Sequence, residues 1–216
     1  GNAEYATIEN CYATGEVNSQ PAGGLIGRVY NSNVNNCYSS VTISSTGYNV
    51  GGLIGMIKSS TVTNSATWAD ITISGSAAGN VGGFVGNTYD ATVKNCYVVL
   101  ENLEKSGISA SSSLVTHFGS FIGYEENHNY NKFSNCTTYD VAEFGPAYNL
   151  MTLSGITRVT DSRGPNIKLK DKAFITSSSI VDGSIKDLAD YNTTLGELGF
   201  SGTGTIVLEI AGDMER

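Results

Sequence analysis

Two acidic residues, Asp70 and Glu101, stand at spacings that could place their carboxylates side by side. Each follows an Asn-Ser or Asn-Cys pair by five residues, the position that Glu16 and Thr42 take elsewhere in the chain. Two neighbouring carboxylates would share a proton or bind a cation such as calcium. The alternative is that both point into solvent from a turn. Apart from calcium at this pair, the sequence indicates no cofactor.

A second group of candidate residues lies in residues 124–132, a segment that is longer than its counterpart earlier in the chain. Its aromatic rings offer flat apolar faces, and its acidic and imidazole groups offer hydrogen bonds, a mixture that suits a sugar or a protein surface. A tolerated surface loop is the alternative. The candidate ligand-binding residues are Tyr124, Glu125, Glu126, His128 and Tyr130.

Tyr12, Tyr38 and Tyr97 form another series, because each directly follows a cysteine. They could stack on sugar rings or form a half-buried ladder that stabilises a sheet. The cysteines themselves recur at one repeat position. Equivalent atoms of stacked strands are about 4.8 Å apart, whereas disulfide-bonded Cβ atoms are about 3.5–4.5 Å apart, so we expect unpaired, buried thiols.

These residues all belong to an internal repeat. A short apolar segment bracketed by glycine occurs at residues 22–27, 50–55, 81–86 and 118–123, with Gly24, Gly52 and Gly83 at equivalent positions. A second half-unit places one asparagine ahead of a cysteine or serine in each copy and once more near the start. These asparagines are Asn10, Asn36, Asn64, Asn95 and Asn135.

The pattern inside each unit predicts short strands rather than helices. Apolar residues cluster in brief runs separated by Gly, Ser and Thr, with no sustained 3.6-residue period. A unit of 28 to 31 residues is too short for a four-stranded propeller blade. We therefore expect an all-β, right-handed parallel β-helix with three short strands per coil. The asparagines would form an inward ladder, and the glycines would serve turns of positive φ or close backbone approach.

The repeat resembles the GLUG motif of bacterial secreted and surface proteins. The matching residues are 50–55 (Val-Gly-Gly-Leu-Ile-Gly), 61–65 and 11–17, and the resemblance covers about residues 4 to 139. It implies an extracellular or cell-surface location and an adhesin-like binding role toward a glycan or a surface protein. It supplies no catalytic residues. A structural spacer or assembly segment of a larger surface protein is the alternative.

Domain organisation follows from where the repeat ends. Residues 1–139 should form the coils, and residues 140–216 should form a C-terminal cap of the same domain, because a stack of coils needs cover at its open edge. A strand is expected near residues 156–159, another near 205–208 and a short helix at 184–191. The half-unit at the start indicates a trimmed chain or a longer repeat array.

Composition and the absence of known motifs argue against several classes of partner and function. Twelve basic against twenty acidic residues give a net charge of -8, which disfavours nucleic acid. No apolar run approaches the roughly 18 residues needed for membrane insertion of this segment. Motifs of serine hydrolases, zinc proteases and phosphate-binding loops are absent. We expect no enzyme, and a carbohydrate-active enzyme that uses Asp70 and Glu101 is the less favoured alternative because no Lys or Arg is aligned with them.

Overall fold

The structure, a computed structural model, describes residues 1–46, 48–74, 79–106, 117–126, 129–140 and 153–160, and the short segments 168–169, 175–176, 179–180 and 210–211. Within these residues every regular element is a β-strand, and none is a helix that could cross a membrane. The predicted helix at 184–191, the predicted strand near 205–208 and His128 lie outside the described residues.

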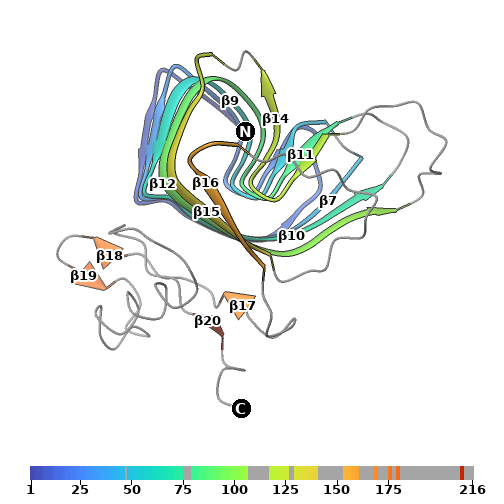
Figure 1. The fold of residues 1–216 in the computed structure, drawn as a ribbon. Helices are drawn as coiled ribbons and strands as arrows, with labels where there is room; N and C mark the ends of the chain where they lie inside the picture. Colours follow the sequence, from blue (N-terminus) through green and yellow to red (C-terminus); the bar gives the residue numbers. More distant parts are fainter. Residues whose placement is uncertain are drawn as a thin grey trace.

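The strands wind into a β-solenoid, which confirms the predicted all-β fold of stacked parallel strands (Figure 1). In chain order they are β1 (Asn2–Glu4), β2 (Thr7–Glu9), β3 (Tyr12–Val17), β4 (Ala22–Gly23), β5 (Ile26–Tyr30), β6 (Asn33–Asn35), β7 (Tyr38–Ser45), β8 (Val50–Gly51), β9 (Ile54–Thr63), β10 (Ala66–Ser74), β11 (Asn80–Gly82), β12 (Val85–Ser106), β13 (His117–Gly119), β14 (Ile122–Glu126), β15 (Lys132–Asp140) and β16 (Ile156–Thr160).

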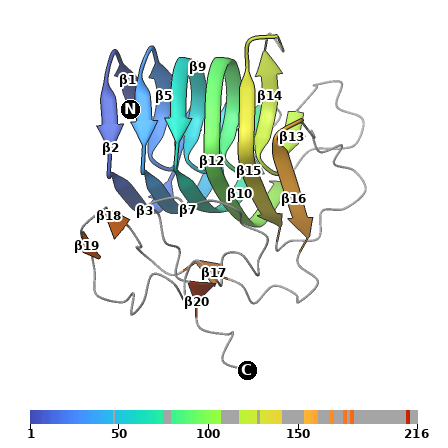
Figure 2. The same ribbon diagram turned by 60° about the vertical axis from the view of Figure 1, so that its left-hand side comes forward.

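Each strand pairs in parallel with its counterpart in the next coil, so the strands lie side by side along the stack (Figure 2). The first face comprises β1, β5, the start of β9, the start of β12 and β14. The second face comprises β2, β6, the rest of β9, the middle of β12 and the start of β15. The third face comprises β3, β7, β10, the end of β12, β15 and β16.

A short fourth ladder departs from the predicted three strands per coil. The order β4-β8-β11-β13 forms a separate four-stranded sheet, which we call the glycine face. The glycine that directly follows each of its first three strands is required by close backbone approach, because a Cβ on Gly52 would lie 2.1 Å from the carbonyl oxygen of Gly83. Gly24 and Gly83 are equally confined, at 2.1 Å and 2.0 Å from the oxygens of Gly52 and Ser120. The sequence predicted either turns of positive φ or close backbone approach for these glycines, and the structure shows close backbone approach.

The core fills the inside of the coil with columns of equivalent apolar side chains. One column is Ile26, Ile54, Val85 and Ile122, and each member is at most 8% exposed. Phe84 and Phe121 stack with their ring centroids 4.7 Å apart. Full burial of such a side chain stabilises the fold by about 1.5–3 kcal/mol, so every added coil extends one continuous core.

The asparagine series occupies the corner between the second and third faces. All five residues have positive φ, between 50° and 55°, a conformation that asparagine tolerates better than most residues. Asn135 Nδ2 donates to Asn95 Oδ1 (2.8 Å), and Asn95 Nδ2 donates to Asn64 Oδ1 (3.0 Å). Asn64 then donates to Asn35 Oδ1 (2.9 Å) rather than to Asn36.

The expected inward ladder is therefore wrong in two respects. It is not continuous, because the Asn64 amide skips Asn36, whose own Nδ2 donates to Asn10. It is not wholly inside either, since Asn10 and Asn135 are exposed and only Asn36 is buried. The reason is that the left-handed backbone at a corner directs the side chain along the outer rim of the coil.

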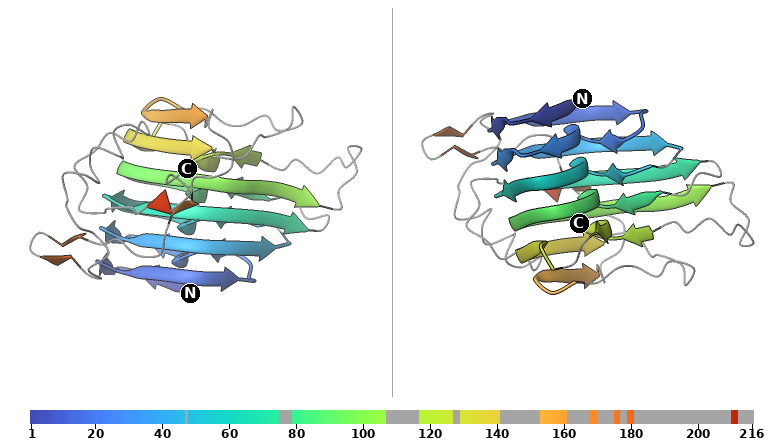
Figure 3. Two further views of the ribbon diagram at one scale, coloured as in Figure 1. Left: turned by 90° about the horizontal axis from the view of Figure 1, so that it is seen from below. Right: turned by 90° about the horizontal axis from the view of Figure 1, so that it is seen from above.

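The stack continues beyond the last glycine segment. Strand β16 pairs in parallel with β15, with Ile156 opposite Cys136, so residues after 140 add a strand to the third face. This strand lies where the sequence predicts one. Farther along, β17 (Lys168–Leu169) pairs antiparallel with β20 (Ile210–Ala211), and β18 (Ile175–Thr176) with β19 (Ser179–Ile180). Figure 3 shows β16 at the opposite end of the stack from β1 and β2.

Candidate functional site

The corner between the first and second faces has the most distinctive backbone geometry outside the asparagine corner. Tyr5, Asn31, Ser59 and Asp90 occupy equivalent positions there, with φ between 47° and 51°. A left-handed conformation costs an ordinary residue roughly 1–2 kcal/mol, so neighbouring coils must hold the corner in place. These four residues differ in type, and sequence reasoning missed the corner for that reason.

Buried serine side chains hold this corner. Ser60 Oγ donates to the carbonyl of Lys58 (2.7 Å) and accepts the backbone N–H of Ser32 (3.0 Å). Ser32 Oγ in turn accepts the N–H of Ala6 (3.0 Å). Each buried hydroxyl thus joins its own turn to the preceding coil, and the outer side chains of the corner project from a fixed backbone.

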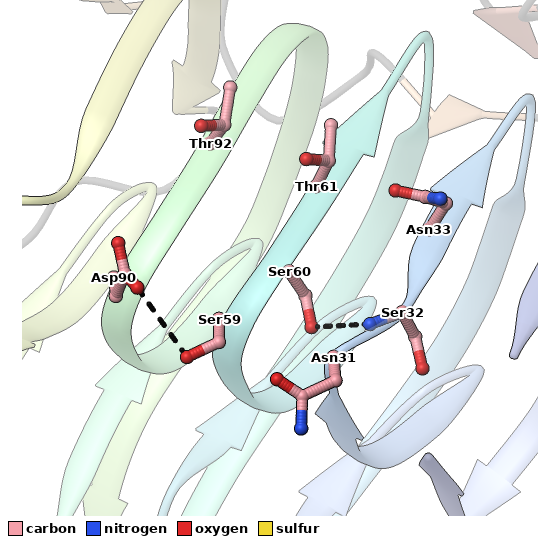
Figure 4. Close-up of a pocket in the computed structure, with 8 residues that line it drawn as sticks. All are labelled: Asn31, Ser32, Asn33, Ser59, Ser60, Thr61, Asp90 and Thr92. Carbon is pink, nitrogen blue, oxygen red and sulfur yellow. Dashed lines mark hydrogen bonds between the residues drawn. The ribbon is translucent and has the colours of Figure 1, made fainter. Parts of the chain in front are cut away.

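The outer side of the corner forms a polar groove of about 430 Å³ that crosses successive coils (Figure 4). Its one charged lining residue is Asp90, whose Oδ2 lies 3.5 Å from Ser59 Oγ. The other lining groups are hydroxyls and amides. The residues of this corner groove are Asn31, Ser32, Asn33, Ser59, Ser60, Thr61, Asp90 and Thr92.

Aromatic and basic side chains border the corner groove on the first face. Tyr30, Lys58 and Tyr89 stand opposite one another in register, one residue before the corner. Lys58 Nζ lies 5.2 Å from the centroid of the Tyr89 ring, a cation–π distance. The groove itself therefore consists of rows of hydrogen-bonding groups at the coil spacing of about 4.8 Å, and the two rings lie on the adjoining first face.

A second polar hollow of about 390 Å³ lies at the far end of the third face. It contains amides and hydroxyls but no charged side chain, and its lining residues are Asn18, Ser19, Gln20, Ser44, Ser45, Thr46 and Ser74. Ser45 Oγ donates to the carbonyl of Ser19 (2.9 Å) across the hollow. Part of its polar lining is thereby already satisfied within the protein.

Glu125, one of the candidate ligand-binding residues, does not lie on the surface. Glu125 is 5% exposed and stands opposite Thr88, in the interior column that Val29 and Ile57 occupy in earlier coils. Side chains alternate between the two sides of a strand, and β14 extends through Glu126, so the register turns Glu125 inward. An inward carboxylate is not available to a surface ligand.

The other residues of the insertion do not form one surface. Tyr124 is half-buried against His117, with their ring centroids 4.5 Å apart. Glu126 and Tyr130 are exposed. Asn131 takes the role that serine has in earlier coils, because its Oδ1 accepts the N–H of Ala91 (2.9 Å). The insertion thus includes a corner-holding residue that the sequence did not indicate.

Asp70 and Glu101 are not register partners. A β-bulge between Ala69 and Asp70 places Asp70 opposite Asn102, and Asn102 Nδ2 donates to Asp70 Oδ1 (3.1 Å). The expected adjacency is wrong because the extra residue of β12 leaves Glu101 without an opposite residue in β10. Calcium binding by Asp70 and Glu101 stays a prediction, as does the carbohydrate-active alternative that uses the same two residues.

The series Tyr12, Tyr38 and Tyr97 does not form an exposed surface on which sugar rings could stack. Tyr12 is 48% exposed, but Tyr38 and Tyr97 are 0% and 2% exposed, and Ala66 lies between them in the register. Burial raises the pKa of Tyr97 to about 12, with a smaller contribution from the neighbouring thiols Cys96 and Cys136. Tyr38 and Tyr97 cannot contact a sugar in this structure.

The four cysteines are free thiols that follow the asparagine corner. Each donates to the carbonyl two residues earlier, as in Cys96 Sγ to Lys94 O (3.3 Å) and Cys136 Sγ to Ser134 O (3.4 Å). Ser65 makes the same contact with Thr63 (2.8 Å), so thiol and hydroxyl are interchangeable here. Burial raises the pKa of Cys37 to about 11 and the pKa of Cys96 well above the usual thiol value.

Comparison with known protein families finds a recognised repeat motif in two segments of these coils. Residues 22–44 and 77–99 match the GLUG motif, and each match runs from the glycine face through both corners into the third face. No curated protein matches the chain significantly. The chain therefore contains GLUG repeats, and the GLUG motif does not define an enzyme family.

Proposed function

We propose that this chain is a binding module of a secreted or cell-surface protein, and that its ligand is an extended, uncharged glycan lying in the corner groove. The observation that carries the proposal is the groove lining of hydroxyls and amides with one carboxylate. Tyr30 and Tyr89 stand one residue before the corner, on the first face. Sugar hydroxyls both donate and accept hydrogen bonds, and such a lining offers partners for both. Aromatic faces pack against the apolar C–H surfaces of sugar rings.

Charge supports an uncharged ligand. The chain has a net charge of -8, and the one charged residue that lines the groove is the carboxylate of Asp90. Lys58, the basic residue beside the groove, has its ammonium group over the Tyr89 ring. A polyanionic glycan would be repelled by this field, whereas a neutral glycan would use Asp90 as a hydrogen-bond acceptor.

Repetition supports an extended ligand. Asn33, Thr61 and Thr92 present the same row from three successive coils, about 4.8 Å apart (Figure 4). A polymer that repeats along the stack could make the same contact in each coil. No catalytic residue is proposed, and this module would hold its ligand without changing it.

A glycan array of neutral and acidic polysaccharides tests the proposal, followed by calorimetry with Thr61→Val. This variant keeps the shape of the side chain and removes one groove hydroxyl, so affinity should fall roughly two- to tenfold. Thr42→Val, a half-buried threonine of the third face, is the matched control and should bind as the unmodified chain does. If no neutral glycan binds, the structural spacer is the better account.

A further inference from the structure

The third face carries apolar side chains on its outer side as well as its inner side. In β7 and β10 the inward residues, such as Val41 and Ala69, belong to the core, and the residues between them face outward. Several outward residues are nevertheless buried and lie outside the core cluster. We call this set, Tyr38, Ala66, Tyr97 and Val99, the outer strip.

The outer strip is covered, because its two tyrosines are almost fully buried. Tyr12 of β3 is 48% exposed, whereas its partner Tyr38 is 0% exposed and Tyr97 is 2% exposed. Neighbouring coils lie beside these rings and do not cover their outer faces. Tyr12 lies in the first coil, where the inward residues Ala13 and Val17 are half-exposed as well, so its exposure reflects the end of the stack. The burial of Tyr38 and Tyr97 means that further chain packs over β7, β10 and β12.

Trp68 gives a second sign of this cover. It is the one tryptophan of the chain and stands on the outer side of β10, two residues after Ala66. Its Nε1 is buried and has no hydrogen-bond partner. An indole nitrogen on the outside of a bare sheet would reach water, so the cover extends over Trp68.

The described C-terminal strands lie where the cover must be. Strand β17 contacts β12, and β17 pairs with β20. Figures 1 and 2 both place β17 and β20 next to the outer side of the third face. We propose that the outer strip is a docking surface for the C-terminal part of this same chain, with the β17–β20 pair as its contact. This part then seals the side of the coil rather than only its open end.

Photo-crosslinking of the full chain tests the occupant. A benzophenone residue in place of Leu169 should capture peptides of β10 or β12 within one molecule. Capture only of other faces would overturn the proposal, and so would capture only between two molecules, because the occupant would then be a second copy.

Trp68 emission and tyrosine nitration test the cover independently. In the unmodified chain Tyr12 should react and Tyr38 and Tyr97 should be protected; equal reaction of all three would overturn the proposal. The double variant Leu169→Asp with Ile210→Asp should shift Trp68 emission to longer wavelength and expose both buried tyrosines, with the circular dichroism of the coils retained. Unchanged emission and protection would overturn it as well. Ser134→Asp, an exposed position of the second face, is the control and should change neither signal.

Discussion

At the residue scale, backbone conformation decides which side chains occupy the corners. Asn64 combines a φ of 50° with two side-chain hydrogen bonds, one to Asn35 and one from Asn95. The recurrence of asparagine made this corner predictable from the sequence. The hydrogen-bond partners at this corner could not be predicted from the sequence, because the Asn64 amide donates to Asn35 and not to the equivalent residue Asn36.

Replacing Asn64 with alanine should reduce the free energy of unfolding by about 1–3 kcal/mol, from the left-handed conformation and the lost hydrogen bonds together. Asn64→Gly should lose less, because glycine adopts positive φ at little cost. Urea unfolding measures both, and Asn33→Ala at an exposed strand position is the control. Equal losses for alanine and glycine would show that the conformation contributes nothing.

The thiols make a second prediction at this scale. Burial raises the pKa of Cys37 to about 11, so its reactive thiolate is scarce at pH 8, and Cys96 is fully buried as well. Only the exposed Cys11 should react quickly with a thiol reagent in the folded chain. Mass spectrometry after a timed pulse identifies the modified residue, and Cys11→Ser should remove the fast phase. Rapid modification of Cys37 or Cys96 would contradict the buried positions.

At the scale of elements, the glycine face shows why the repeat is strict at some positions and loose at others. Gly24, Gly52 and Gly83 each lie under a carbonyl of the next coil, whereas the equivalent residue of the last glycine segment is Ser120. The glycine spacing therefore revealed the register. A single bulge at Glu101 and the inward turn of Glu125 escaped prediction, because one extra residue reverses which side chains face the core.

Gly52→Ala should destabilise the chain by about 3 kcal/mol or more, because its Cβ would lie 2.1 Å from a backbone oxygen that cannot move without shifting a coil. Ser120→Gly is the matched change at the equivalent position of the last glycine segment and should cost under about 1 kcal/mol. Thermal unfolding compares the two. A Gly52→Ala chain that melts like the unmodified one would mean that the coils are spaced more widely here.

At the scale of the whole molecule, stacking turns unremarkable single residues into rows. Asn33, Thr61 and Thr92 share no motif in the sequence, yet parallel register aligns them beside one corner. The repeat predicted the solenoid, because its period and glycines recur. The groove could not be predicted, since the residues of its corner, Asn31, Ser59 and Asp90, have only their backbone conformation in common.

Dependence of affinity on ligand length tests the central claim, that the stacked rows of the corner groove bind an extended neutral glycan. Calorimetry with a series from monosaccharide to hexasaccharide, cut from a glycan that binds, would measure it. The first and last of the three rows, at Asn33 and Thr92, are about 10 Å apart. Affinity should rise until the ligand is long enough to cover this distance and should then level off. Thr61→Val should weaken the longer ligands more than the monosaccharide. A monosaccharide that binds as tightly as the hexasaccharide would contradict binding along the stack.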